Sequence, residues 1–400
     1  MELQLIPPEH WEKIFPHWEE LSRTSVEPTV FLSPLWIASW WRHFSEERQP
    51  CMLAAWEAGR LCGLAPFYFR RISLPGVKRG ALALSFMGDE GVGSEYLGLL
   101  VLPGYEEEFL LAVSEWLRGQ WAMADLHGLR EGGSLSLKIA KILGASAPKR
   151  VYRERRSCCL IPLPGDYESY LRSLSQNFRA AIRKRTNKLV KNFRVNLLRT
   201  TREEEIKPHL ERFFAMHQAR WLAKGSLGSF YSARKCAFYR DVSVGLLRRG
   251  LLRFYHLEVD GAVRASQFGF AFGGVLHSLQ DAFDHEFHLK NVGALGVVLR
   301  AMAIKESILE GLDGYDFLAG MEEFKVRWKT IARHVQRVRI GAPGLKGAAA
   351  FSLSVGVLKA KDWARERAPN WLMNTRRQLR TWNRSRNAPV VALGAGEKRT

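Results

Sequence analysis

The spacing of hydrophobic residues in the first part of the chain predicts alternating helices and strands. Pro34–Phe44 carries its Trp and other apolar side chains at helical spacing, so we expect a helix there. Two strand-like runs follow, Cys51–Trp56 and Leu61–Tyr68, joined by Glu57–Arg60, whose Gly suits a tight hairpin. Next come an apolar run at Ala81–Met87 and a Gly-rich loop at Gly88–Gly93, and we then expect a strand at Tyr96–Val101, a helix at Glu106–Gly119, a strand at Met123–Leu129 and a helix at Ser134–Leu143.

The second part of the chain shows a similar order of elements. A helical hairpin, Tyr167–Phe193 and Glu203–Ala223, precedes a strand pair, Leu252–Val259 and Arg264–Phe272, with an Asp-Gly turn between them. The elements that follow are a strand at Val275–Ala282, a helix at Ala294–Glu310, a strand at Tyr315–Leu318, a helix from Glu322 and a strand at Val335–Ile340. This alternation indicates an α/β fold with a mixed sheet, and the repeated order indicates a tandem duplication.

The composition divides the chain into three expected regions. The first half should span residues 1–155 and the second half residues 156–341. Residues 342–400 should form a basic amphipathic, helical tail with a disordered end. From residue 341 onward we count 12 basic and 3 acidic residues, so this segment supplies +9 of the net charge of +20. Such a charge attracts anions, whether nucleic acid, acidic lipid or phosphorylated cofactors.

Composition also bears on where the protein is found. Five cysteines without a metal-like C-x-x-C spacing indicate free thiols in a reducing compartment, and we expect no metal. The first ten residues do not resemble a signal peptide, and the apolar stretch Gly347–Leu358 is shorter than the roughly 20 residues of a membrane span. We therefore expect a cytoplasmic protein, with peripheral placement on the inner face of the membrane as a further possibility.

The most informative segment, Phe283–Ile308, predicts a strand, a Gly-containing turn and an apolar-faced helix. Backbone N–H groups at the start of such a helix, with glycines that allow close approach, form a cradle for a pyrophosphate. Seven residues make up the predicted cradle: Lys290, Asn291, Val292, Gly293, Ala294, Leu295 and Gly296. By itself this motif is more often a plain strand–helix turn, with its glycines chosen for backbone angles.

The order of elements resembles the GNAT superfamily of acyl-CoA-dependent N-acyltransferases, and in particular the CelD/BcsL-type acetyltransferases. The resemblance covers about residues 30–340. It rests on five segments: FLSPLWIASWW at Phe31–Trp41, LAPFYFRR at Leu64–Arg71, the loop Phe86–Val101, AFDHEF before KNVGALG, and YDFLAGMEEFKVRW at Tyr315–Trp328. It implies two GNAT-like halves, acyl-CoA as co-substrate and a link to bacterial polysaccharide synthesis. This chain departs from the family loop at Leu295, where the pattern has Gly or Ala, and its second glycine comes one place later.

Candidate reactive residues lie near the predicted cradle. An amine that attacks a thioester must lose a proton, and a carboxylate or His can accept it. Asp281, Asp284 and His285 lie between the central strand and the cradle, and His256 lies on the preceding hairpin. Each of these residues, taken singly, is more often structural than catalytic. The first half has no comparable turn, so we expect it to shape the acceptor site.

The resemblance further implies substrate-binding residues near the end of the second half. These are Tyr315, Asp316, Lys325 and Trp328. The alternatives are that Asp316 caps a turn, that Lys325 lies on a helix surface and that Trp328 packs in the core. Core packing is the favoured reading for Trp328.

Three classes of function remain in competition. The first is an acyl-CoA-dependent transferase acting on an amine or hydroxyl of a cell-envelope or lipid precursor, such as a polysaccharide intermediate or a sphingoid base. The second is a Fem-type aminoacyl transferase using charged tRNA, and the third is a non-catalytic module that binds nucleic acid or lipid. The basic helix predicted at Arg172–Arg194 and the Arg- and Trp-rich tail suit phosphate groups, an anionic membrane surface or only water. We favour the first class, with nucleic acid the less favoured partner.

Overall fold

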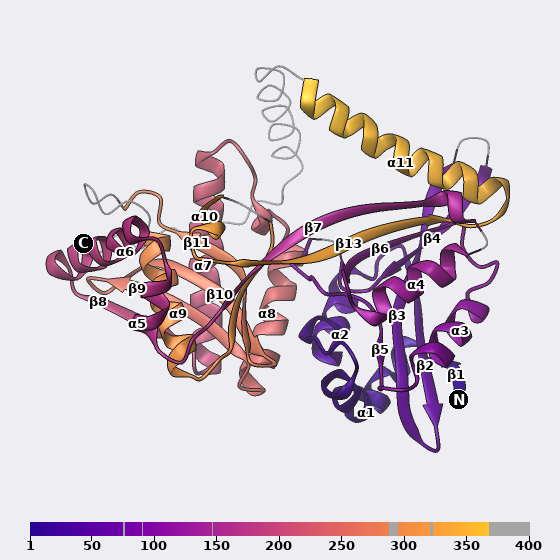
Figure 1. The fold of residues 1–400 in the computed structure, drawn as a ribbon, viewed down its shortest axis with the longest axis horizontal. Helices are drawn as coiled ribbons and strands as arrows, with labels where there is room; N and C mark the ends of the chain where they lie inside the picture. The colour runs from indigo at the N-terminus through magenta and orange to yellow at the C-terminus, as the bar shows by residue number, and fades with distance from the viewer. Residues whose placement is uncertain (75–76, 90, 146, 288–294, 321–322, 368–400) are drawn as a thin grey trace, which may run out of the picture.

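The computed structural model describes residues 1–367 except 75–76, 90, 146, 288–294 and 321–322. In these ranges thirteen strands form one mixed sheet with helices packed around it (Figure 1). The strands are β1 Glu2–Leu5, β2 Arg48–Glu57, β3 Arg60–Leu74, β4 Val77–Phe86, β5 Leu100–Val101, β6 Met123–Arg130, β7 Val151–Pro162, β8 Val195–Arg199, β9 Leu252–Val259, β10 Ala262–Phe272, β11 Val275–Phe283, β12 Gly314–Ala319 and β13 Ile331–Gly341.

Helices are interspersed with the strands along the chain, as expected of an α/β fold. They are α1 Trp11–Thr24, α2 Pro34–Phe44, α3 Glu106–Trp116, α4 Ser134–Gly144, α5 Tyr167–Ser173, α6 Gln176–Asn192, α7 Glu203–Ala223, α8 Ala233–Arg248, α9 Leu295–Leu309, α10 Glu323–Val326 and α11 Gly344–Arg367. No helix in the described ranges is both long enough and apolar enough to cross a membrane.

The sheet has the same plan in both halves of the chain. In the first half the antiparallel strands β1–β4 are followed by the parallel pair β4 and β6. In the second half the antiparallel strands β8–β11 are followed by the parallel pair β11 and β12. β7 and β13 run side by side from one half into the other (Figure 1), and β13 pairs with β6 while β7 pairs with β12. The repeated plan agrees with the predicted duplication.

The predicted hairpins and several helices are confirmed. α2 has the predicted bounds, and the turn between β2 and β3 places Ala58 and Gly59 in the left-handed region, with φ of 47° and 78°. The same geometry recurs at Asp260 and Gly261, where φ is 48° and 77°. Both turns have the backbone that a tight hairpin requires, and this explains why their sequences are recognisable.

One predicted strand is wrong: the strand expected at Tyr96–Val101 is reduced to β5, because Tyr96 has a φ of 53° and the chain bends there instead of extending. The two helices of the predicted hairpin are present, the first as α5 and α6 and the second as α7, but β8 lies between them and pairs with β9 at the edge of the sheet. Besides β8, four elements had not been predicted: β1, α1, β7 and α8. β7 carries charged residues at successive positions, which hides the strand periodicity.

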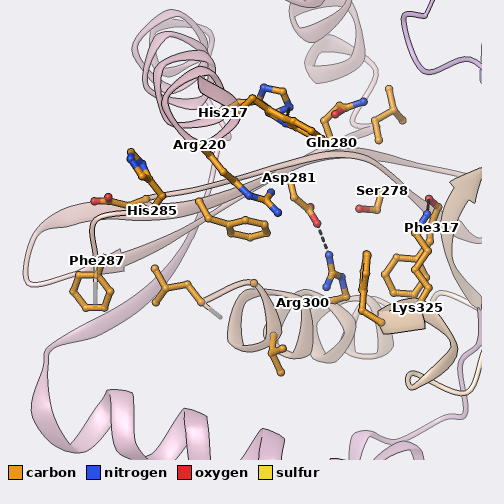
Figure 2. Close-up of a pocket in the computed structure, with 18 residues that line it drawn as sticks. His217, Arg220, Ser278, Gln280, Asp281, His285, Phe287, Arg300, Phe317 and Lys325 are labelled. Atoms are coloured by element: carbon orange, nitrogen blue, oxygen red, sulfur yellow. Dashed lines mark hydrogen bonds and ion pairs between the residues drawn. The ribbon is translucent and has the colours of Figure 1, made fainter. Parts of the chain in front are cut away.

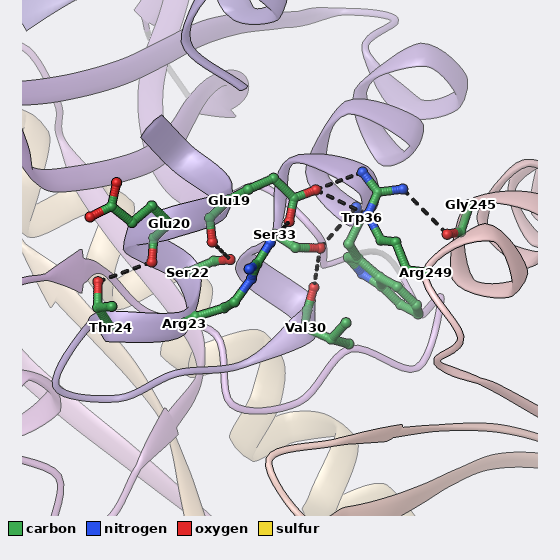
Figure 3. Close-up of polar contacts among 10 residues, drawn as sticks. All are labelled: Glu19, Glu20, Ser22, Arg23, Thr24, Val30, Ser33, Trp36, Gly245 and Arg249. Carbon is green, nitrogen blue, oxygen red and sulfur yellow. Dashed lines mark hydrogen bonds and ion pairs between the residues drawn. The ribbon is translucent and has the colours of Figure 1, made fainter. Parts of the chain in front are cut away.

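The two halves pack against each other through α2 and α8. Trp36 of α2 is completely buried, and its ring lies 5.1 Å from Phe238 of α8 and 6.0 Å from Phe270 of β10, between ring centroids. At the edge of this interface, Arg249 donates to Glu19 of α1 at 2.6 Å and to the Gly245 carbonyl at 3.3 Å (Figure 3). The interface therefore combines an aromatic core with a polar rim.

Close approach of α2 to α8 leaves little room for a side chain at position 245. A Cβ atom there would lie 2.2 Å from Leu35 Cδ1. We predict that Gly245→Val separates the helices and lowers the free energy of unfolding by about 1–3 kcal/mol, the usual cost of overpacking. Gly356→Val is the matched control, because Gly356 is also helical but has open space around it. Urea unfolding of both variants checks the prediction, and equal stability of the two would contradict it.

Candidate functional site

A cavity opens where β11 and β12 separate. The two strands pair in parallel only from Val275 to His277 on β11 and from Gly314 to Asp316 on β12. A register shift between β10 and β11, at Phe268 and Gly269, lies beside the point of separation. The space between the parted strands and α9 forms a cavity of about 560 Å³ (Figure 2). Its lining comes from α7, β11, the segment after β11, α9, β12 and α10.

An ion pair lies inside this cavity. Arg300 of α9 and Asp281 of β11 point toward each other and form a charge-assisted hydrogen bond (Figure 2). Their side chains are only 7% and 18% exposed. Burial by itself lowers the pKa of Arg300, but the Asp281 carboxylate outweighs this effect and the pKa is raised. Asp281 is therefore already committed to a cation, although its Oδ1 atom and Arg300 Nε have no hydrogen-bond partner among the described residues.

Aromatic rings surround the Arg300 guanidinium. Its Cζ atom lies 5.1 Å from the ring centroids of Phe317 and Phe324 and 5.9 Å from that of Trp328. Cations over aromatic faces at such distances gain stabilisation, and the gain is larger when water is excluded. The rings and Asp281 together compensate the burial of this charge.

The other predicted proton acceptors have different surroundings. Asp284 and His285 also line the cavity. Asp284 accepts a hydrogen bond from Arg264 at 2.8 Å; burial raises the pKa of Asp284, but this bond and the Arg264 charge bring it below its usual value. His256 is completely buried between Thr200 and Ser266, 2.9 Å from each hydroxyl, and burial lowers its pKa to about 3. It does not line the cavity.

The predicted pyrophosphate cradle is described only at its end. Lys290, Asn291, Val292, Gly293 and Ala294 lie outside the described residues, whereas Leu295 and Gly296 line the cavity at the start of α9. A Cβ atom at Gly296 would lie 2.7 Å from the Phe283 ring, so glycine is needed for this approach of α9 to β11.

The four predicted substrate-binding residues divide between the cavity and its surroundings. Lys325 lines the cavity and donates to the Ala319 carbonyl at 2.8 Å. The Tyr315 hydroxyl donates to Gln267 Oε1 at 2.7 Å in the interior. Trp328 is 1% exposed and stacks edge-on against Phe178 of α6, as core packing would require. Asp316 is completely buried and belongs to a second polar group.

This second polar group joins the two halves beside the cavity. The Tyr96 hydroxyl, from the loop before β5, donates to Asp316 Oδ2 at 2.6 Å. The adjacent Glu95 is 6% exposed, and burial raises its pKa to about 7 despite the attraction of Arg156. Asp316 raises the pKa of Glu95 further, whereas Lys325 lowers it. The junction of the halves therefore holds a carboxyl group that changes charge near neutral pH.

α7 supplies basic groups that the sequence analysis did not identify. His217 and Arg220 line the cavity from the side opposite Arg300 (Figure 2). Trp221 Nε1 donates to His217 Nε2 at 3.0 Å, and burial lowers the pKa of His217 to about 4. Burial also lowers the pKa of Arg220, whose guanidinium lies 4.9 Å from the Phe283 ring centroid. His217 and Arg220 do not stand out in the sequence. Arg300 of α9 does, because it is a lone charge within an apolar helical run.

The residues of this region match a known domain. Residues 176–326 match the family model described as an acetyltransferase (GNAT) domain. This part of the chain has a GNAT-type fold. The match supports N-acyl transfer as the general chemistry, in which an acyl donor and an amine acceptor meet. No curated protein matches the chain. Among the described residues, no group of three or more His, Cys, Asp and Glu side chains is placed to hold a metal ion.

Solved structures share the fold of this chain over most of its length. The crystal structure of FemX aligns with a TM-score of 0.56 at 12% identity, covering 84% of this chain and 97% of FemX. The C-terminal domain of a putative lysylphosphatidylglycerol synthetase from Agrobacterium fabrum aligns with a TM-score of 0.50 at 11% identity, covering 87% and 97%. L-PGS from Bacillus licheniformis aligns with a TM-score of 0.50 at 10% identity, covering 89% and 97%. At these identities the likeness concerns the fold.

The buried ion pair generates a first prediction for the site. Asp281→Asn leaves the Arg300 charge buried without its anion, and we expect a loss of about 3–5 kcal/mol in the free energy of unfolding. Asp284→Asn should cost less, because its partner Arg264 is 34% exposed. Replacing the pair together, by Asp281→Leu with Arg300→Met, should restore much of the loss. Urea unfolding measures all three variants, and equal destabilisation by the two Asn substitutions would contradict the prediction.

The raised pKa of Glu95 predicts a pH dependence of stability. The folded protein holds the Glu95 proton more tightly than the unfolded chain does. The contribution of Glu95 to stability is therefore greatest below the ordinary carboxyl pKa of 4.5 and falls as the pH rises toward about 7. The loss is on the order of 3 kcal/mol. The Gln side chain of the Glu95→Gln variant cannot ionise, so the stability of this variant relative to the native protein should rise as the pH increases toward 7. Unfolding curves for both proteins at pH 5, 6, 7 and 8 provide the measurement, and a constant difference would refute the prediction.

Proposed function

We propose that this protein transfers an acyl group from a coenzyme A thioester to an amine or hydroxyl. The observation that carries the proposal is the cavity between the parted strands β11 and β12, above the start of α9. Strands that part in this way expose backbone groups along which an extended donor can lie, and the helix start beside them favours phosphate. The acceptor is expected to approach from the first half.

The residues present fit a phosphorylated thioester. Arg220, Arg300 and Lys325 outnumber Asp281 and Asp284 in the cavity lining, so the lining favours an anion. The segment 290–296 is our proposed pyrophosphate site. When bound, the thioester would supply an activated acyl carbonyl and a thiolate leaving group, while the chain orients the donor and excludes water.

The acceptor that we propose is an amine- or hydroxyl-bearing precursor of the cell envelope or of a lipid. A polysaccharide intermediate, as in the CelD/BcsL-type enzymes, or a long-chain amine would suit a protein placed at an anionic membrane surface. The support for this placement is the basic composition of the chain after residue 341. Residues 368–400, which hold most of that charge, lie outside the described residues.

An aminoacyl group carried on tRNA is the second candidate donor. The observation that favours it is the row of basic side chains on α6, where Arg179, Lys184 and Lys188 are among the charged residues. Such a row suits a polyanion more than a single coenzyme. Titration with acetyl-CoA and with aminoacyl-tRNA separates the two candidates, because only the true donor should saturate the cavity.

Donor binding generates a charge-reversal prediction on α7. Arg220 lines the cavity, whereas Arg212 on the same helix lies outside it and donates to the Val263 carbonyl. Arg220→Glu should weaken acetyl-CoA binding about 10-fold or more, the value of one lost charge-assisted contact, while Arg212→Glu makes the same charge change with a smaller effect. Isothermal calorimetry measures both variants. If neither substitution changes the affinity for acetyl-CoA, the donor does not bind in this cavity. If the native protein does not bind acetyl-CoA, the proposal is wrong.

A further inference from the structure

The loop between β4 and β5 brings first-half residues to the point where β11 and β12 separate. The Val92 carbonyl accepts a hydrogen bond from Tyr239 of α8 at 2.9 Å, and Ser94 Oγ accepts one from Trp36 of α2 at 2.8 Å. A Cβ atom at Gly93 would lie 3.6 Å from Leu279, which lines the cavity. The loop is therefore held by both halves beside the cavity wall.

The last paired residues of the two parallel strands are His277 and Asp316, and Tyr96 of the loop contacts both. Besides its hydrogen bond to Asp316, the Tyr96 ring lies 6.4 Å from the His277 ring between centroids. Immediately after this pair, Ser278 of β11 and Phe317 of β12 line the cavity. The first-half loop thus lies against the cavity wall, at the point where β11 and β12 separate.

Glu95, next to Tyr96 in this loop, is a buried carboxylate with one oxygen that lacks a hydrogen bond within the described ranges. Its Oε2 atom is buried and makes no hydrogen bond with the described residues. The charged and titratable groups that act on it come from three other elements: Arg156 of β7, Asp316 of β12 and Lys325 of α10. Cys158 of β7 lies in the same group. Lys325 also lines the cavity, so it links Glu95 to the proposed donor site.

A buried carboxylate kept only for stability is normally hydrogen-bonded, because an unpartnered one is costly. Glu27 of the same half shows that pattern, since its Oε1 accepts a hydrogen bond from the Leu135 N–H at 3.3 Å. Burial raises the pKa of Glu27 as well as that of Glu95. Glu27 is therefore a matched control, because it shares the raised pKa but differs from Glu95 in its hydrogen bonding and in its location.

Three other titratable groups near the cavity are less suited to accept a proton. Asp281 is paired with Arg300, and Asp284 is paired with Arg264. Burial lowers the pKa of His277 to about 4, so it binds a proton weakly at neutral pH. Glu95 titrates near pH 7, where a general base works best.

We propose that Glu95 is the proton acceptor for the attacking amine and that the acceptor reaches the thioester from the side of the first half, where β11 and β12 separate. This inference rests on the proposed acyl transfer. The amine nitrogen forms a bond to the acyl carbon as the carbon–sulfur bond breaks, and coenzyme A leaves as the thiolate. The ammonium proton passes to the Glu95 carboxylate and from there to solvent or to the thiolate, which balances the reaction.

Carbodiimide labelling of the full chain tests whether Glu95 faces the donor. N,N′-dicyclohexylcarbodiimide modifies protonated carboxyl groups, and mass spectrometry of peptides locates the label. At pH 6 we expect Glu95 to be labelled in the free protein and protected by acetyl-CoA, with labelling of Glu27 unchanged. If Glu95 is not labelled, or if acetyl-CoA binds in calorimetry without protecting it, the inference is overturned. If acetyl-CoA does not bind, the proposed function fails first.

A kinetic test addresses the proton transfer itself. Hydroxylamine serves as a small nucleophile, and release of coenzyme A from acetyl-CoA is followed from pH 5.5 to 8.5. The native rate should rise with an inflection near pH 7, while Glu95→Gln should lower it about 10²–10⁴-fold and remove the inflection. Glu27→Gln should keep both the rate and the inflection. This role for Glu95 is ruled out if the Glu95→Gln variant has the same pH–rate profile as the native protein. It is also ruled out if the native protein binds acetyl-CoA but releases no coenzyme A.

Discussion

The backbone ladder between β7 and β13 is the constraint on which the arrangement of the site depends. The two strands pair continuously from Val151 with Ile340 to Leu160 with Ile331. Because β13 also pairs with β6 and β7 also pairs with β12, this ladder makes one sheet of both halves. The first-half loop can then lie in a fixed position beside the residues where β11 and β12 separate. A hinge between independent halves would not hold Tyr96 within hydrogen-bond distance of Asp316.

The cavity holds more charge than an apolar interior tolerates without compensation. Arg300 is compensated by one carboxylate and three aromatic rings, and it fills part of the space between the parted strands. Such a group stabilises the fold only while its partners are present. The same fixed charges are preorganised for a charged donor, since they require no rearrangement when it binds.

The two polar groups of the site have separate tasks in the proposed reaction. Asp281, Arg300 and Arg220 lie along the cavity where the donor is expected to bind. Glu95, Tyr96 and Asp316 lie beside the cavity, where the two halves meet. This division explains how a duplicated fold can use one half for the donor and the other for the acceptor. In this proposal the first half needs no cradle of its own.

Local sequence determined the elements whose signals are local, and tertiary structure decided the rest. The helix Pro34–Phe44 and the hairpin turns at Gly59 and Gly261 follow from periodicity and backbone preference, so the sequence predicted them. The placement of Asp281, Asp284 and His285 beside a common cavity also followed from their spacing along one strand and the turn after it.

β7 was missed because its charged residues mask the strand pattern. Glu95 was missed for a deeper reason: its burial, its missing hydrogen bond and its neighbours Asp316 and Lys325 come from chain segments more than 200 residues apart. Only folding brings such groups together, so only the tertiary structure gives that carboxylate its chemistry.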